Sequence, residues 1–256
     1  GFDPYMVTTY KDSDVRRVVA LDKAKAESTE DVLADPIKAK VFQHYMDKSE
    51  VPMGPMVDSA GTRISGIEDF LGRDQYGIDS PHPNMVVSDI LEQFPVLSHA
   101  GKFHAMLATS SIPEAVNYYH LFKQQAPKLH VTALFDPNID NNEGATDKED
   151  ALTEIITDYN EAFGKEFIIP TWPAMKKDIS SRLSHKSPYG GIATNRSQQL
   201  DLLIVVDQML TGFDSKWVNT LYLDKIIDYE SIIQAFSRTN RVLNEKKRFG
   251  KIGFLT

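Results

Sequence analysis

The sequence has no cysteine in its 256 residues. That absence excludes disulfides, iron–sulfur clusters, thiolate zinc sites and cysteine nucleophiles, and it fits a reducing compartment. Long apolar runs are also missing, so the sequence predicts neither a membrane-spanning helix nor a membrane partner. A signal peptide is not predicted either, because charged residues interrupt the N-terminus: Lys11, Asp12, Asp14, Arg16 and Arg17. We therefore expect a cytoplasmic protein.

An excess of basic charge is absent as well. The chain holds 28 Lys and Arg against 36 Asp and Glu, which gives a formal net charge of −8. This balance argues against a domain that binds nucleic acid through a broad basic field, although single contacts to backbone phosphates stay compatible with it. The seven histidines are scattered along the chain, and we expect no metal site.

Hydrophobic residues make up 41% of the chain, which is typical of a globular protein. Beyond residue 95, apolar runs of strand length alternate with segments of helical periodicity, and this pattern predicts an α/β fold with a parallel sheet flanked by helices. The expected strands are Lys102–Thr109, Leu129–Phe135, Leu202–Val206, Val218–Leu223 and Gly250–Leu255. The expected helices run from Ser111 to Gln125, Ala151 to Phe163, Pro173 to His185 and Tyr229 to Arg241.

The first 95 residues are harder to interpret, and we expect a mixed, partly irregular segment there. Tyr5–Tyr10 reads as a short strand, while Glu30–Asp47 and Met85–Phe94 have helical spacing, the last helix ending before Pro95. We predict two parts, residues 1–95 and residues 96–256. Because residue 1 is glycine and the last residues read as a strand, we expect a piece of a longer protein.

Ligands of an open parallel sheet bind beyond the carboxyl ends of its strands. Three segments follow such ends here: Thr109–Ser111, Asp207–Asp214 and the turn after Leu223. In the second segment, Gly212 allows a close backbone approach and Asp214 can accept hydrogen bonds from ribose hydroxyls. A turn glycine followed by a helix-capping aspartate is the structural alternative.

The predicted helix 229–241 carries the most specific pattern. Gln234, Arg238 and Arg241 are spaced i, i+4, i+7 and fall on one stripe, opposite the apolar residues of the same helix. Arginine suits phosphate recognition, since its planar guanidinium stays charged and can bond two oxygens at once. Taken alone, the pattern is weak and is more typical of a solvated basic face that makes surface salt bridges.

Together these segments resemble the second RecA-like lobe of superfamily 2 helicases. Phe103–Ser111 resembles motif IV, VVDQMLTGFD resembles motif V, and Gln234–Arg241 resembles motif VI. The stretch Leu202–Val242 is similar to the restriction (R) subunit of type I restriction–modification enzymes. The resemblance covers residues 96–256 and implies a RecA-like lobe, with residues 1–95 as the connection from a first motor lobe.

The resemblance implies roles for individual residues. Arg241 would be the arginine finger on ATP, with Arg238 beside it and Gln234 orienting the phosphate or the attacking water. Gly212 and Asp214 match nucleotide-contacting positions of motif V. Contacts to the DNA backbone would come from motif IV and motif V, namely from Thr109, Ser110, Ser111 and Thr211.

Two departures from the superfamily pattern are visible. Ser237 and Asn240 stand where the superfamily has glycines, in agreement with the type I subgroup. Val206 stands where a DNA-contacting threonine often precedes the motif V acid, which leaves the DNA role of motif V open.

Several motifs that a complete helicase motor needs are absent from this sequence. It contains no GxxxxGK[ST] loop, no DExH-type acidic motif and no convincing nuclease cluster. The resemblance therefore implies that ATP and Mg²⁺ are bound mainly by the first lobe, and that the chain alone neither hydrolyses ATP nor cuts DNA. The partners it implies are double-stranded DNA, the first lobe and nuclease domain of the same chain, and the modification and specificity subunits.

Two alternatives stay open at this point. One is a lobe of another superfamily 2 helicase, for example in repair; an N-terminal nuclease in the parent would favour restriction instead. The other is a non-catalytic docking module, whose arginine face binds a carboxylate patch on a protein.

Overall fold

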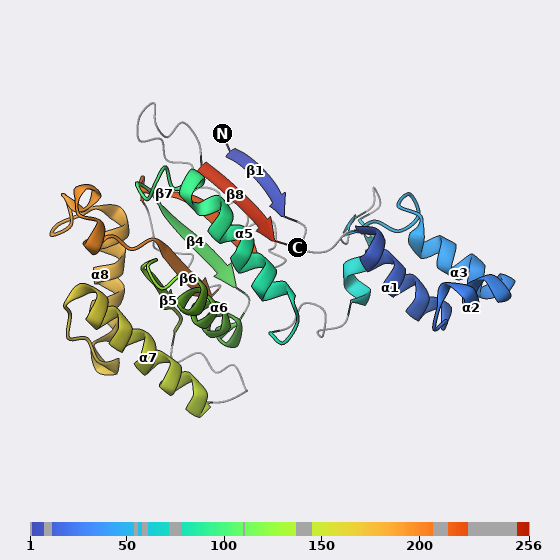
Figure 1. Ribbon diagram of the computed structural model, residues 1–256, viewed down its shortest axis with the longest axis horizontal. Helices are drawn as coiled ribbons and strands as arrows, with labels where there is room; N and C mark the ends of the chain where they lie inside the picture. Colours follow the sequence, from blue (N-terminus) through green and yellow to red (C-terminus); the bar gives the residue numbers. More distant parts are fainter. Residues whose placement is uncertain are drawn as a thin grey trace. The chain divides into compact units, whose positions relative to one another are not determined.

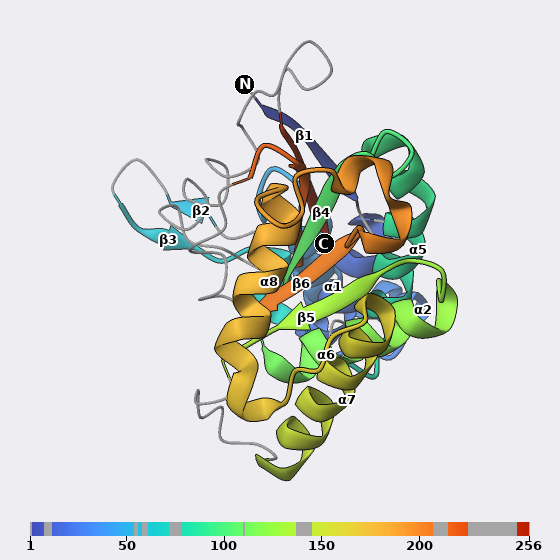
Figure 2. The same ribbon diagram turned by 90° about the vertical axis from the view of Figure 1, so that its left-hand side faces the viewer.

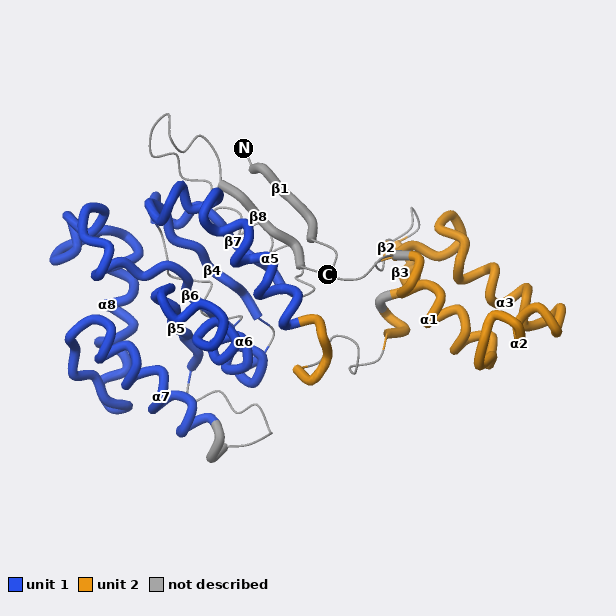
Figure 3. The backbone as a smooth tube through the Cα atoms, in the orientation of Figure 1, with its two compact units in different colours: residues 1–7, 83–256 blue, residues 8–82 orange. Residues whose placement is uncertain are grey.

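The computed structural model describes residues 2–7, 12–53, 56–57, 61–71, 78–109, 111–136, 145–206, 215–224 and 250–255. The chain divides into two compact units, residues 8–82 and residues 1–7 with 83–256 (Figure 3). Each unit has its own cluster of buried apolar side chains.

The larger unit is built on a six-stranded sheet (Figure 1). Its strands are β1 (Phe2–Val7), β4 (His104–Thr109), β5 (Val131–Leu134), β6 (Leu202–Val206), β7 (Val218–Asp224) and β8 (Gly250–Leu255). They lie in the order β1-β8-β7-β4-β6-β5, and every neighbouring pair is parallel. The side chains of β4 are all buried, as expected of a strand covered on both faces.

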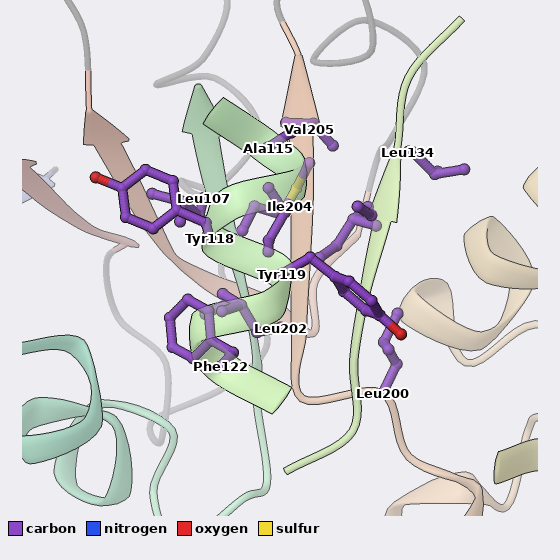
Figure 4. Close-up of a cluster of buried hydrophobic side chains, with 14 of the residues drawn as sticks. Leu107, Ala115, Tyr118, Tyr119, Phe122, Leu134, Leu200, Leu202, Ile204 and Val205 are labelled. Carbon is purple, nitrogen blue, oxygen red and sulfur yellow. The ribbon is translucent and has the colours of Figure 1, made fainter. Parts of the chain in front are cut away.

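Four longer helices accompany this sheet: α5 (His82–Leu97), α6 (Ile112–Gln125), α7 (Ala145–Phe163) and α8 (Trp172–Ser184). A short 3-10 turn at Ile169–Thr171 lies between α7 and α8, and two more, at Ile192–Thr194 and Arg196–Gln198, lie between α8 and β6. Figures 1 and 2 show α5 and α6 lying along the sheet. Figure 4 shows Ala115, Tyr118 and Phe122 of α6 directed toward the aliphatic side chains of β4 and β6. The predicted class, an α/β fold with a parallel sheet flanked by helices, is confirmed.

The smaller unit contains α1 (Asp12–Ala24), α2 (Thr29–Ala34), α3 (Pro36–Met46), the short pair β2 (Met56–Val57) and β3 (Arg63–Ile64), and a 3-10 turn at Ile67–Phe70. Val15, Val19, Val51 and Ile67 form its core. The buried Arg16 donates from Nη1 to the carbonyl oxygens of Val51 and Tyr45, at 2.7 and 3.2 Å, and so ties α1 to the end of α3.

Several boundaries differ from the sequence-based expectation. The single helix expected over Glu30–Asp47 is two helices, because Asp35 is extended and precedes Pro36, and its carboxylate accepts from the amide of Ile37 as the N-cap of α3. Helix α5 continues through Pro95 to Leu97. Helix α7 begins at Ala145, earlier than expected, and the first strand spans Phe2–Val7.

The division between the units lies at residue 82/83, whereas the sequence placed a boundary at 95/96. The physical reason is α5, whose Val86, Ile90 and Phe94 are buried in the core of the larger unit. Strand β1 also belongs to that unit, since it pairs with β8. Residues 8–82 therefore form an insertion between β1 and α5. The function assigned to residues 1–95, a connection between motor lobes, stays a prediction.

Candidate functional site

Three strands of the larger unit end side by side. In the parallel register, Thr109 of β4 pairs with Val206 of β6 on one side and with Asp224 of β7 on the other. The segments that resemble motifs IV and V include Thr109 and Val206. The segment that resembles motif VI begins ten residues after Asp224, at Gln234, and lies outside the described residues. We call the edge formed by Thr109, Val206 and Asp224 the carboxyl rim of the sheet.

Thr109 and Ser111 organise the first of these segments. Thr109 is fully buried, and its hydroxyl donates to the carbonyl oxygen of Val205 at 3.2 Å and lies 3.4 Å from that of Ser111. Ser111 is the N-cap of α6, and its Oγ accepts from the amide of Glu114 at 3.3 Å, a bond typical of a serine followed three residues later by glutamate at a helix start. The hydroxyl of Thr109 is thus engaged with the neighbouring strand, and the DNA contacts assigned to Thr109 and Ser111 stay predictions.

A tyrosine–aspartate pair lies at the same rim. Tyr118 projects from α6, is almost fully buried, and donates its hydroxyl to the carboxylate of Asp224, the last residue of β7. Burial and the adjacent carboxylate raise the pKa of Tyr118 well above its usual value, so the hydroxyl keeps its proton and acts as a donor. The sequence reasoning missed this pair. Its only signal was that Tyr118 shares the apolar face of α6 with Ala115 and Phe122.

The remaining predicted site residues lie outside the described part of the chain. These are Ser110, Thr211, Gly212, Asp214, Gln234, Arg238 and Arg241, together with the predicted helix 229–241. Their roles in binding ATP or DNA stay predictions.

The amino end of the same sheet holds a second polar group of residues. His104, at the start of β4, shares a hydrogen bond through Nδ1 with the carbonyl oxygen of Leu200, and its Nε2 lies 2.8 Å from Nε2 of His185. Since a carbonyl can only accept, His104 carries its proton on Nδ1 and His185 donates from Nε2. The His185 ring stacks on Trp217 at 3.9 Å between centroids. Burial lowers the pKa of His104 to about 3 and that of His185 to about 4, so both rings are neutral.

Arg182 of α8 completes this amino-end network. Its side chain is fully buried, and all five of its N–H groups have acceptors. They reach the Tyr159 hydroxyl, the backbone and side-chain oxygens of Gln198, the Asp178 carboxylate and the Tyr189 hydroxyl, at 2.5 to 3.2 Å. The guanidinium also lies 3.9 Å above the Phe163 ring. Both hydroxyls donate in turn to Asp178, which closes the network.

Within the described ranges, no group of three or more His, Asp or Glu side chains is arranged to hold a metal ion. A search of the same ranges finds no helix with the length and apolar character that a membrane crossing requires.

Comparison with known proteins identifies one family. Residues 101–255 match type I restriction enzyme subunit R domain 3. The type I restriction enzyme SauCOLORF180P endonuclease subunit of Staphylococcus aureus (strain COL) is 34% identical over 176 residues, which cover 66% of this chain and 18% of that protein. The SsaAORF53P endonuclease subunit of Staphylococcus saprophyticus is 34% identical over 200 residues, or 75% of this chain and 21% of that protein. The HindI endonuclease subunit of Haemophilus influenzae is 29% identical over 163 residues, which cover 64% of this chain and 13% of that protein.

The chain thus spans about a fifth of the length of the curated relatives it matches. Among solved structures, the C-terminal part of the Fun30 ATPase domain aligns with 96% of this chain and 61% of its own, with a TM-score of 0.39 and 9% sequence identity. A likeness of that size is too weak to add to the assignment.

Proposed function

Because the chain belongs to the family of type I restriction enzyme subunit R domain 3, we propose that it is the second motor lobe of an ATP-dependent DNA translocase. In this proposal it closes on a first RecA-like lobe around ATP and contributes groups that stabilise the transition state of hydrolysis. Cyclic closure would move double-stranded DNA toward a nuclease domain elsewhere in the parent protein.

The observation that supports this proposal best is the alignment of Thr109, Val206 and Asp224 at the carboxyl rim. Parallel sheets bind ligands beyond this edge. The segments that resemble motifs IV and V each include one residue of this rim, Thr109 and Val206, although the two lie far apart in the chain. A docking module has no need to bring residues of motifs IV and V to one edge.

The residue roles follow from the resemblance. Arg241 would be the arginine finger, which stabilises the charge that builds on the transferred phosphoryl group, and Arg238 would assist it. Gln234 would orient the phosphate or the attacking water, and Gly212 and Asp214 would contact the nucleotide. ATP and Mg²⁺ would be held mainly by the first lobe. Contacts to the DNA backbone would come from Thr109, Ser110, Ser111 and Thr211.

The wider setting is also part of the proposal. The lobe would work in the cytoplasm within a complex that includes the modification and specificity subunits, and the specificity subunit would read the DNA sequence. The 256-residue chain by itself would be inactive, because its sequence carries no Walker loop and no nuclease motif.

The decisive test is a charge-preserving substitution in the intact R subunit. Arg241→Lys keeps the positive charge but loses the planar fork of the guanidinium, so DNA-dependent ATP hydrolysis should fall by a factor on the order of 10³. Arg17→Lys is the matched control, since Arg17 is an exposed arginine in the inserted unit and pairs only loosely with Asp14, at 3.8 Å. Full activity of Arg241→Lys would favour the docking module.

A second measurement uses the chain alone. Calorimetry should detect weak ATP binding or none, because the main phosphate-binding loop is absent from the sequence. Submicromolar affinity would contradict the half-site arrangement.

A further inference from the structure

The segments at the amino end of the sheet carry a charge opposite in sign to that of the whole chain. Four described segments lie directly before the strands β4, β5, β6 and β7: residues 98–103, 126–130, 185–201 and 215–217. Together they contain five Lys and Arg residues against a single acidic residue, whereas the whole chain has an excess of Asp and Glu. The five cations are Lys102, Lys128, Lys186, Arg196 and Lys216.

The one acidic residue of these segments, Asp201, is engaged inside the protein. Its side chain is 1% exposed, and its carboxylate accepts from the amide of His130 at 2.9 Å and from Nη1 of Arg196. A buried carboxylate with these partners presents almost no negative charge to an approaching ligand. The surface that the four segments form is therefore cationic.

Backbone hydrogen bonds join the four segments in a row. The amide of His104 donates to the carbonyl oxygen of Trp217 at 2.8 Å. The amide of Ala105 donates to the carbonyl oxygen of Asp201 at 2.9 Å, and the amide of Asp201 donates to that of His130 at 2.8 Å. These bonds follow the strand order β7-β4-β6-β5, and neighbouring strands lie about 4.8 Å apart. The cations are thus spread along an edge of about 14 Å instead of meeting at one point.

Arg196 is held in place within this row. Its Nη1 donates to Asp201 and, at 3.1 Å, to Oε1 of Gln199, while its side chain stays 52% exposed. The guanidinium packs on Gly101, where an added Cβ would lie 3.0 Å from Nη1 and 3.1 Å from Cζ. An arginine that is fixed at one nitrogen and half-exposed loses little conformational freedom when it binds an anion.

Two exposed lysines lie on either side of Arg196 in the row. Lys128 is two residues before His130, and Lys186 directly follows His185, whose ring stacks on Trp217. An ammonium on an exposed loop suits phosphate, to which lysine binds as a point charge. A row of separated cations fits a linear polyanion better than a single anionic group.

We propose that the amino end of the sheet is a second contact surface for duplex DNA, in which Lys128, Lys186 and Arg196 bind backbone phosphates. The proposed function places its DNA contacts at the opposite, carboxyl rim, and this inference rests on it only for the identity of the polyanion. Duplex DNA fits the row because it carries negative charge at every position along its length, whereas an acidic protein would need carboxylates that match each cation. Such contacts position the duplex and carry no sequence information.

The experiment measures binding of a non-specific DNA duplex to the full-length R subunit, without ATP, between about 50 and 200 mM salt. Each phosphate contact that is lost should lower the slope of log K against log salt concentration by about 0.9. For Lys128→Gln combined with Lys186→Gln we expect the slope to fall by about 1.8. The loss of affinity over this range of salt should then be about tenfold smaller than in wild type.

Lys177→Gln is the matched control, because Lys177 is an exposed lysine of the same unit that lies within α8, outside the four segments. Its slope should equal that of wild type, and thermal unfolding of all variants should match wild type, since the substituted side chains are exposed. An unchanged slope in the double variant would overturn the inference, and so would equal decreases for Lys177→Gln and Lys186→Gln. Wild-type DNA binding together with weaker binding of the modification and specificity subunits would assign the surface to an acidic protein instead, which also overturns it.

This measurement gives a result whether or not Arg241 is an arginine finger, because it needs no ATP hydrolysis. If Arg241→Lys keeps full ATPase activity, the proposed motor role fails while the slope of the double variant still decides the DNA contact. If Arg241→Lys is inactive and the slope is unchanged, only the second DNA surface is refuted.

Discussion

The two ends of the parallel sheet use polar residues differently. At the amino end, His104, His185 and Arg182 are held by partners within the protein, and all five N–H groups of Arg182 have acceptors there. At the carboxyl end, Thr109 lies in register with Val206 and with Asp224, and the segments that resemble motifs IV and V include the first two of these residues. The largest pKa shifts among the histidines belong to the amino end, yet nothing in the sequence resemblance points there. The histidines with strongly lowered pKa values thus belong to a stabilising network, and the candidate site is identified by the order and register of the strands.

Removal of Arg182 should have the largest effect on stability. Arg182→Leu leaves Asp178 without its buried cation and Gln198 without its donor, so the free energy of unfolding should fall by about 3–5 kcal/mol. Denaturant unfolding of the chain measures this, with the exposed Arg17→Leu as a control expected within about 0.5 kcal/mol of wild type. A loss below about 1 kcal/mol for Arg182→Leu would show that the amino end is not held by this network.

A fall in pH should have the second-largest effect on stability, through the buried histidines at the amino end of the sheet. Burial is the main cause that lowers the pKa of His104 to about 3; the nearby His185, Arg196 and Arg182 lower it further, while the bond to Leu200 opposes the shift. The folded form keeps this ring neutral, whereas the unfolded chain binds a proton below about pH 6.5. The stabilisation is therefore complete above pH 6.5 and is lost as the pH falls toward 3.

Between pH 7 and pH 5 the contribution of His104 to the free energy of unfolding should drop by about 2 kcal/mol, which pH-dependent denaturant unfolding can measure. His104→Leu should flatten this slope. His120→Gln is the matched control, because His120 is half-exposed and lies beside Glu154 on the surface. An unchanged slope in His104→Leu would contradict the assignment of the acid sensitivity to the buried pair.

The fold could be predicted well where a local signal coincides with tertiary packing. Leu202–Val206 is a wholly apolar run and is the strand β6, and Ser111 with Glu114 marks the start of α6. The periodicity from Glu30 to Asp47 gave one helix because it ignored Pro36, which separates α2 from α3. Helix α1 was not predicted, since charged residues surround its few apolar positions.

The candidate site could be predicted only in part. Thr109 and Ser111 could be predicted because they follow the end of an expected strand. Contacts between residues far apart in the chain leave no such local pattern in the sequence. Tyr118 and Asp224 are 106 positions apart, and His104 and His185 are 81 apart. Each pair joins the end of a strand to a residue of a helix or helix cap, so it meets only because of how α6 and α8 pack on the sheet, and that packing is not readable from one sequence.

Two buried threonines of the sheet differ in whether the side-chain hydroxyl has a hydrogen-bond acceptor. Thr109→Val removes a hydroxyl that donates to Val205, so the free energy of unfolding should fall by about 1 kcal/mol. Thr132 of β5 is equally buried, but its hydroxyl has no hydrogen-bond partner among the described residues, so Thr132→Val should be neutral or stabilising. Denaturant unfolding of both variants checks this difference, and equal losses would refute it.

The same Thr109→Val variant tests the predicted DNA contact in the R subunit. If the hydroxyl serves only the sheet, DNA-stimulated ATP hydrolysis should match that of wild type at a temperature where both are folded. A contact to the DNA backbone would instead weaken DNA binding by a similar factor for every DNA sequence.

The N-cap of α6 should give the smallest effect. Ser111→Ala leaves the amide of Glu114 without its capping oxygen, and the free energy of unfolding should fall by about 0.5–1 kcal/mol. Ser88→Ala, at an exposed position inside α5, should change it by a few tenths of a kcal/mol in the opposite direction, because alanine has the higher helix propensity. Opposite signs in denaturant unfolding would show that Ser111 acts through its position at the helix start. If both substitutions were stabilising, the N-cap bond would contribute nothing to holding α6 at the carboxyl rim.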